Sequence, residues 1–260
     1  MKYLLAPDSF KEAASAQAVA ESMRRGVAAG DPGAECRMMP LSDGGEGLTD
    51  ALVQATGGEL RSEHAHDALG RPIITRYGFL GEGGFGTSHD GENPRTAVVE
   101  LAAASGIERI SPADRDPLAA STFGTGGGML GLFNATMRPG IELVLDLLHA
   151  REACAWADVV ITGEGSIDGQ TPYGKVPSGI ARLAKSQGKP VIAIGGKVTR
   201  DPNVTAALNE AGIVATFGIA PGPAALPELL TGTKRNVEAT CAAIAGLLSV
   251  ARECSSRPHQ

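Results

Sequence analysis

Side chains able to hold a cation, accept a proton or neutralise an anion recur in four short segments of this 260-residue chain. Carboxylates bind Mg²⁺ or take a proton, lysines neutralise phosphate, and glycine-rich backbone offers amides to oxyanions. The segments contain Asp8, Ser9 and Lys11; Ser42, Asp43 and Glu46; Thr162, Glu164, Ser166 and Asp168; and Gly195, Gly196 and Lys197. Any one of them also has the composition of an ordinary strand-to-helix turn. The four together favour a shared site.

Each segment follows a short apolar run that is typical of a buried strand. The predicted strands cover residues 2–6, 36–41, 158–162, 190–194 and 213–219. Predicted helices alternate with them, at residues 16–29, 178–187, 204–211 and 236–253. This alternation predicts an α/β fold, a three-layer, doubly wound, mostly parallel sheet of the flavodoxin or Rossmann-like kind. Ligands of such sheets bind beyond the carboxyl ends of the strands, which is where all four segments would lie.

The stretch from residue 59 to residue 99 has a different pattern. Polar and apolar side chains alternate at 61–66 and again at 73–80, on either side of a Gly-Arg-Pro turn. This indicates a small antiparallel excursion from the parallel sheet. We expect residues 1–254 to form a single α/β domain and residues 255–260 to be a tail.

Composition limits the classes of partner. The chain has 29 acidic and 23 basic side chains, a formal net charge of −6, and no basic run. That balance argues against nucleic acid or an anionic membrane as the main partner. No apolar stretch approaches the ~20 residues of a membrane-spanning helix. The four cysteines are widely spaced, so we expect free thiols in a reducing cytoplasm and no disulfide framework.

Three familiar nucleotide and hydrolase motifs are absent or incomplete. Residues 169–175 fit the pattern G-x-x-x-x-G-K, but Val176 stands where a phosphate-binding P-loop needs Ser or Thr. The pattern G-x-G-x-x-G is matched at residues 81–86 and 126–131, but neither match opens a predicted helix, as a dinucleotide-binding fingerprint requires. The Gly163–Gly165 turn has an acidic residue where a nucleophile elbow has serine. Neither a P-loop nor a dinucleotide-binding site is therefore supported.

Seven segments, in this order, resemble the type I glycerate kinase family. They are residues 6–11 (APDSFK), 40–47 (PLSDGGEG), 100–106 (ELAAASG), 120–126 (ASTFGTG), 138–143 (RPGIEL), 161–171 (ITGEGSIDGQT) and 174–177 (GKVP). Together they extend over nearly the whole chain and form a very specific combination. The resemblance implies transfer of the ATP γ-phosphate to a glycerate hydroxyl, with Mg²⁺, in a cleft between two domains.

The chain departs from the family at one place. Members continue after the counterpart of residues 121–126 into a second α/β domain with a glycine-rich G-G-S-x-T-N-D-G-G segment. Here Gly126 continues directly into residues 127–132, which resemble the family's return stretch. The chain therefore resembles a family member from which that domain has been excised, naturally or by engineering, with the junction near residues 124–128.

The resemblance and the chemistry of the residues together imply roles for particular side chains. We assign proton removal to Asp168 and neutralisation of the phosphate or glycerate carboxylate to Lys11. Binding of Mg²⁺ is assigned to Asp43 and Glu46. The predicted catalytic residues are Asp168, Lys11 and Asp43. The predicted substrate and phosphate contacts are Asp8, Ser9, Thr122, Gly124, Thr125, Gly126, Thr162, Glu164 and Lys175.

Two non-enzymatic alternatives stay open at this point. With one domain missing, the chain is either a weak kinase, a non-catalytic module that binds glycerate or another anion, or a scaffold without a ligand. The expected partners are glycerate and a nucleotide, without nucleic acid or membrane. The sequence leaves open whether the protein is a monomer or a homo-oligomer.

Overall fold

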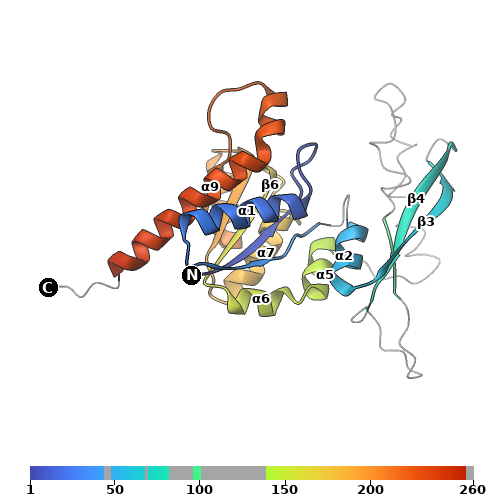
Figure 1. Ribbon diagram of the computed structural model, residues 1–260, viewed down its shortest axis with the longest axis horizontal. Coiled ribbons are helices and arrows are strands. Elements are labelled where there is room, and N and C mark those ends of the chain that lie inside the picture. The colour runs from blue at the N-terminus through green and yellow to red at the C-terminus, as the bar shows by residue number, and fades with distance from the viewer. Residues whose placement is uncertain (44–47, 68–69, 82–95, 101–138, 256–260) are drawn as a thin grey trace. The chain divides into compact units, whose positions relative to one another are not determined.

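The computed structural model describes residues 1–43, 48–67, 70–81, 96–100 and 139–255 (Figure 1). The chain divides into two compact units. The first unit contains Met1–Asp43 and His149–Gln260, and the second contains Gly44–Leu148.

A five-stranded parallel sheet forms the centre of the first unit. Its order is β2-β1-β6-β7-β8, and every neighbouring pair is parallel. The strands are β1 (Lys2–Pro7), β2 (Glu35–Met38), β6 (Val159–Ile167), β7 (Val191–Val198) and β8 (Ile213–Gly218). Helices follow the strands along the chain, so the predicted doubly wound, mostly parallel α/β fold is confirmed.

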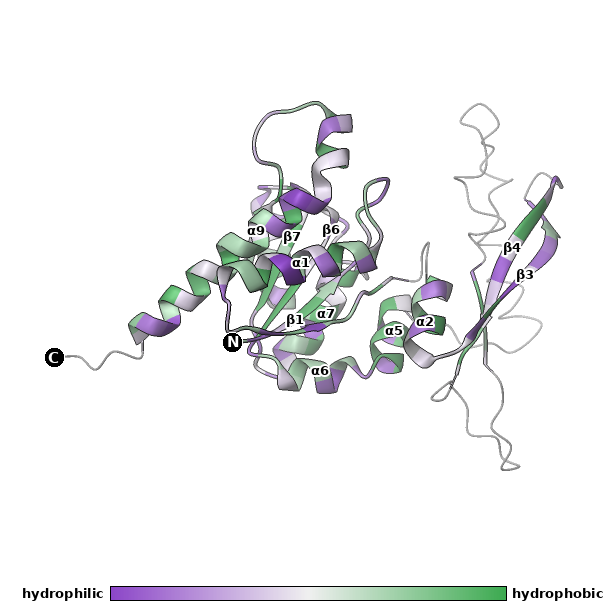
Figure 2. Cartoon of the chain, viewed as in Figure 1, coloured by the Kyte–Doolittle hydropathy of each residue, from purple (hydrophilic) through white to green (hydrophobic). Residues whose placement is uncertain are grey.

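Helices cover both faces of this sheet. On one face α1 (Ala16–Gly30) and α9 (Leu226–Ser255) lie side by side (Figure 1). They pack on alternate strand residues, including Tyr3, Leu5 and Ile161. The opposite face meets α7 (Val176–Ser186) and α6 (Ala150–Trp156), and α8 (Pro202–Ala211) packs beside β8. Figure 2 shows the apolar colouring of β1 and β7, as expected for strands buried on both faces.

Local sequence signals account for several helix ends. The Ser15 hydroxyl accepts the Ala18 N–H at the start of α1, and the Asp201 carboxylate accepts the Asn203 N–H at the start of α8. Gly212 ends α8 in the left-handed conformation, with φ of 111°. The last helix differs from the prediction because α9 begins ten residues before residue 236. Its first turns carry Leu226, Leu229 and Leu230 at helical spacing, a signal that the prediction did not use, and these turns are mostly exposed.

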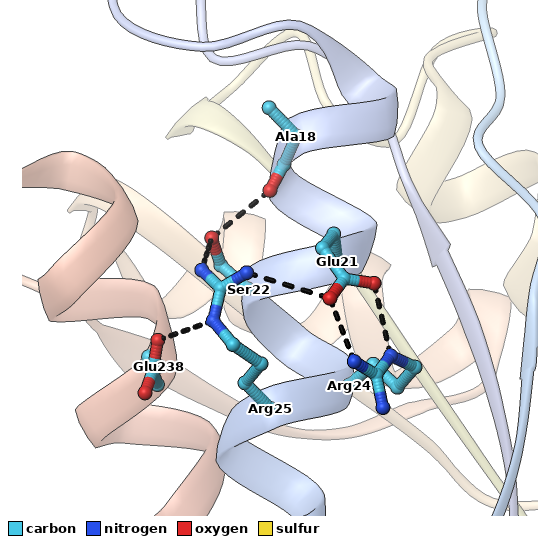
Figure 3. Close-up of polar contacts among 6 residues, drawn as sticks. All are labelled: Ala18, Glu21, Ser22, Arg24, Arg25 and Glu238. Atoms are coloured by element: carbon cyan, nitrogen blue, oxygen red, sulfur yellow. Dashed lines mark hydrogen bonds and ion pairs between the residues drawn. The ribbon is translucent and has the colours of Figure 1, made fainter.

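The pair α1 and α9 is held by close backbone packing and by one ion pair. Arg25 of α1 donates to the Glu238 carboxylate of α9 at 2.8 Å and also contacts Glu21 and Ser22 of its own helix (Figure 3). Both charged groups are more than 40% exposed, so the pair adds little stability. Within the part of the chain that the structure describes, no helix is both long and apolar enough to cross a bilayer.

The second unit is built on a three-stranded antiparallel sheet. Its strands β3 (Glu59–His66), β4 (Pro72–Phe79) and β5 (Ala97–Val99) pair in the order β3-β4-β5. At the β3–β4 connection the Asp67 carboxylate accepts N–H groups from the backbone and side chain of Arg71. Helix α2 (Leu48–Thr56) packs on β3 and β4, and α5 (Gly140–Leu147) completes the described part of this unit. The predicted antiparallel excursion at residues 59–99 is thereby confirmed.

We expect the chain to unfold as one cooperative unit, which is also the test of the predicted single domain over residues 1–254. Excising a segment whose two ends lie close together adds little loop-closure entropy. The lone tryptophan, Trp156, belongs to α6 and reports on the first unit, whereas circular dichroism reports on both. The two signals should give one coincident thermal transition. Two separated transitions would contradict a single domain.

Candidate functional site

The sheet order of the first unit places the ends of β1 and β6 at a topological switch point. From β1 the chain crosses to β2 on one side, and β6 pairs with β1 on the other. The crevice beyond the carboxyl ends at such a point is where open α/β sheets bind ligands. Asp8 directly follows β1, and its N–H donates to the Gly163 carbonyl of β6 at 2.8 Å. Asp8 and the end of β6 therefore adjoin.

Strands β6 and β7 extend further than the sequence predicted. Glu164 and Ser166 were expected in the loop after the strand ending at residue 162, but both lie within β6. Gly195, Gly196 and Lys197 likewise lie within β7. The glycines allow close strand contact rather than a turn: a Cβ on Gly163 would lie 2.5 Å from the Ile194 carbonyl oxygen. That part of the loop prediction is wrong, although the residues remain at the carboxyl edge of the sheet.

Lys175 and Asp43 form an ion pair at the carboxyl edge of the parallel sheet. After β2 the chain stays beside β1, where the Leu41 N–H donates to the Pro7 carbonyl at 2.9 Å. This brings Asp43 to Lys175, with Nζ and Oδ2 at 3.2 Å. Lys175 is the residue that precedes α7, and its side chain makes no capping hydrogen bond to that helix.

A second network joins Glu164, Thr171 and Asp168. The Thr171 hydroxyl donates to Oε1 of Glu164 at 2.7 Å and accepts the Asp168 N–H at 3.0 Å. The Asp168 carboxylate accepts the Ser166 hydroxyl on Oδ2 at 3.1 Å and the Gln170 N–H on Oδ1 at 2.9 Å. Glu164 is 8% exposed and Thr171 is 1% exposed, so the network is mostly shielded from water.

Burial and mutual repulsion shift the pKa values of the carboxyl groups. Burial raises the pKa of Glu164 to about 7, with the charges of Asp8 and Asp168 adding to the rise and the Thr171 hydrogen bond and Lys175 opposing it. Burial raises the pKa of Asp8 to about 6, assisted by Asp43 and opposed by the Ser9 N–H and by Lys175. Partial burial lowers the pKa of Lys175, but the carboxylates around it raise that pKa by more. Titratable groups with shifted pKa values thus gather at the switch point, as they do at many active sites.

Three other predicted residues lie along the same edge. The Ser9 N–H donates to the Asp8 carboxylate at 2.6 Å, and Ser9 follows Asp8 in the β1–α1 loop. A Cβ on Gly165 would lie 3.6 Å from the Lys11 amide nitrogen, so the Lys11 backbone passes beside β6 while its side chain is exposed. Thr162 is fully buried, and its hydroxyl donates to the Ala6 carbonyl at 2.7 Å. That bond gives Thr162 a role within the sheet, and its predicted ligand contact stays a prediction.

Several predicted site residues lie outside the described residues. They are Glu46, Thr122, Gly124, Thr125 and Gly126. The predicted Mg²⁺ ligand pair of Asp43 and Glu46 and the anion-binding loop at residues 122–126 therefore stay predictions.

Sequence reasoning missed the part played by Thr171. This residue belongs to the 161–171 segment, but no role was predicted for it from the sequence. Only the turn at Asp168 returns Thr171 to Glu164. A spacing of seven residues across a strand end has no fixed geometry, so no signal in the sequence identified this contact.

The pKa of Glu164 predicts a pH dependence of stability. The pKa of Glu164 rises from its ordinary value of 4.5 to about 7 in the folded state. Between these two pH values the folded chain therefore binds more protons than the unfolded chain. The contribution of Glu164 to stability is therefore full below pH 4.5 and is lost as pH rises to about 7, by roughly 2–4 kcal/mol for a shift of this size. The change Glu164→Gln removes this contribution, so we expect the variant to lose less stability than wild type between pH 5 and pH 8.

Urea unfolding followed by Trp156 fluorescence measures this difference. The exposed residue Glu210 in α8 provides the matched control, because Glu210→Gln makes the same chemical change away from the site. Equal pH slopes for wild type and Glu164→Gln would contradict the buried, neutral state of this carboxyl group.

Comparison with known proteins identifies relatives of the whole chain. A family model described as "Glycerate kinase family" matches residues 3–129 and 124–249. The glycerate kinase of Bacillus subtilis (strain 168) is 26% identical over 391 aligned positions, covering 97% of this chain and 99% of that protein. The glycerate 2-kinase of Escherichia coli (strain K12) is 24% identical over 389 positions, covering 96% of this chain and 98% of that protein.

A solved structure shares the fold. The crystal structure of a protein described as glycerate kinase 2 from Salmonella typhimurium LT2 superposes with a TM-score of 0.71 at 25% identity, covering 97% of this chain and 99% of that one. Both sequence alignments have more positions than the 260 residues of this chain, so each relative contains residues without a counterpart here.

Proposed function

This chain belongs to the glycerate kinase family, and on that basis we propose that it transfers the γ-phosphoryl group of ATP to a hydroxyl of glycerate, slowly when it acts alone. Glycerate and the nucleotide are the proposed small-molecule partners. The four cysteines are all free thiols, which supports the cytoplasm, where ATP is present, as the proposed location.

The observation that carries this proposal is the charge cluster at the switch point. Asp8, Asp43, Glu164 and Lys175 come from four different segments and influence one another electrostatically. Phosphoryl transfer needs an ammonium to neutralise phosphate, an oxygen ligand for a metal ion and an acceptor for the hydroxyl proton. All three chemical types are present in this cluster.

The residues at this edge fit a magnesium ion. Among the described residues no group of three or more His, Cys, Asp or Glu side chains could hold a metal by itself. Mg²⁺ does not require such a group, since it usually takes one or two carboxylates and completes its shell with water and phosphate oxygens. Asp43 already attracts a cation, the Lys175 ammonium, and is the described residue that we propose as a ligand, with Glu46 as the second.

The proposed steps distribute charge among the residues of the site. Lys11 and Lys175 would neutralise phosphate oxygens or the glycerate carboxylate, and Ser9 and the predicted loop at residues 122–126 would offer N–H groups to an anion. When bound, Mg²⁺ would neutralise the charge that develops on the phosphate oxygens. The sequence assigned proton removal to Asp168, whose two carboxylate oxygens accept hydrogen bonds from its own turn.

Two features of the comparisons support the proposed excision of the family's second domain. The family model matches this chain in two pieces that overlap at residues 124–129, at the predicted junction. The alignments to full-length relatives also contain more positions than this chain has residues. Loss of a domain that forms one wall of the cleft is the reason for the slow turnover that we propose.

Radiolabelled phosphate distinguishes the proposed kinase from its alternatives. Transfer of the label from ATP to glycerate, dependent on Mg²⁺, is the expected result. Binding of glycerate or nucleotide in a calorimeter without transfer would favour a non-catalytic binding module. Neither binding nor transfer would favour a scaffold.

A further inference from the structure

We propose that Glu164, oriented by the Thr171 hydroxyl, is the residue that accepts the proton of the glycerate hydroxyl. The proposal rests on the proposed kinase function and names the proton acceptor of that reaction. It reassigns to Glu164 the role that was predicted for Asp168 from the sequence.

The position of Glu164 fits this role. Side chains alternate along a strand, so Glu164 faces the α7 side of the sheet together with Val160 and Thr162, at the carboxyl edge. It stands beside Asp8 at the switch point, because Pro7 and Gly163 are paired in the β1–β6 register. Thr171 occupies Oε1 with its hydroxyl proton, which fixes the orientation of the carboxyl group.

Asp168 has a different set of contacts. Its Oδ1 and Oδ2 accept hydrogen bonds from Gln170 and Ser166, and its own N–H donates to Thr171. These bonds close the turn that returns Thr171 to Glu164. Asp168 is therefore a positioning residue in this proposal, acting through Thr171.

Burial and the charged groups around Glu164 bring the pKa of its carboxyl group close to neutral pH. Asp8 at the end of β1 and Asp168 after β6 are negative, and Lys175 before α7 is positive. Burial and the two carboxylates raise the pKa of Glu164 to about 7. A general base is most efficient when its pKa lies near the working pH.

The proton and electron pairs balance in a single transfer. The glycerate hydroxyl oxygen forms a bond to the γ-phosphorus while the bond from that phosphorus to the bridging oxygen breaks. ADP leaves with the electron pair of the broken bond. The hydroxyl proton moves to the Glu164 carboxylate, which later releases it to water.

Transfer of labelled phosphate from ATP to glycerate at high protein concentration tests the assignment. Glu164→Gln keeps the shape of the side chain and still accepts the Thr171 hydroxyl, but it cannot take a proton. Loss of a general base costs ~10²-fold or more, so we expect transfer by this variant to fall to the background rate. Glu210→Gln, made on the exposed face of α8, should keep the wild-type rate.

The pH profile separates proton removal from positioning. In wild type kcat/KM should rise about tenfold per pH unit below pH 7 and level off above it. Glu164→Gln should lose this rise. Asp168→Asn and Thr171→Val should be slower but keep it, and Thr171→Ser should recover most of the rate because it restores the hydroxyl.

The results of these assays distinguish failure of the proposed kinase function from failure of the Glu164 assignment. Absence of transfer in wild type would overturn the kinase function and, with it, the assignment of Glu164. Transfer that Glu164→Gln leaves intact would overturn only the assignment. A pH-dependent rate that is lost in Asp168→Asn, or in Asp8→Asn, while Glu164→Gln retains it would move the base to that residue.

Discussion

Glycerate phosphorylation by this chain alone is expected to be slow, close to background but measurably above it, and at least ~10²-fold below the rate of a full-length family member measured in the same assay. The resemblance implies that the family holds ATP and glycerate in line between two walls and keeps water from the γ-phosphate. The charge cluster of Asp8, Asp43, Glu164 and Lys175 belongs to one α/β unit. Loss of one preorganised donor already costs ~10²-fold or more, so loss of a whole wall should cost more.

The measurement compares labelled phosphoglycerate with labelled inorganic phosphate, both formed from ATP. Poor exclusion of water should raise the share of inorganic phosphate relative to the full-length protein. Turnover of glycerate at an ordinary enzyme rate, above about 1 s⁻¹, would contradict this prediction. If Glu164→Gln or Asp168→Asn also abolished that rate, one domain would be sufficient for the chemistry.

Element order and type were predictable because most of the parallel strands begin as short apolar runs; β2, with the sequence ECRM, is the exception. Periodicity gave α1 and α8 nearly to the residue, since Ser15 and Gly212 are caps with local hydrogen-bonding or conformational preferences. The ends of β6 and β7 were not predictable in this way. Glycine indicates a turn in a local pattern, whereas Gly163 and Gly195 permit close strand contacts that only the folded sheet creates.

The site was predictable at the level of segments and not at the level of partners. Parallel strands end at one edge, so topology alone brings Asp8, Asp43 and Glu164 together. Which carboxylate pairs with Lys175, and which side chain binds Glu164, depends on the paths of two loops. Those paths are set by contacts such as Leu41 to Pro7 and Asp168 to Thr171.

Replacing Gly26 by alanine is expected to destabilise the first unit by about 3 kcal/mol, because α1 and α9 pack with almost no space between their backbones. A Cβ on Gly26 would lie 2.2 Å from the Glu238 carbonyl oxygen and 2.8 Å from the Cys241 Cβ. Gly30, one turn later, has the same restriction, with the Ala242 carbonyl oxygen at 2.1 Å. The helices would have to separate along their contact, exposing core residues such as Met23 and Ile244.

The same substitution at Gly246 of α9 gives a matched control of opposite sign. A Cβ there would lie 3.8 Å from the Gly30 carbonyl oxygen, which is ordinary van der Waals contact. Alanine is favoured over glycine inside a helix by about 1 kcal/mol, so Gly246→Ala should stabilise the protein slightly. Urea unfolding monitored by Trp156 fluorescence measures both variants, with the midpoint lowered for Gly26→Ala and unchanged or raised for Gly246→Ala. If both variants shifted the midpoint upward, helix propensity would outweigh packing at this contact, and the close approach of α1 and α9 would not be what stabilises the pair.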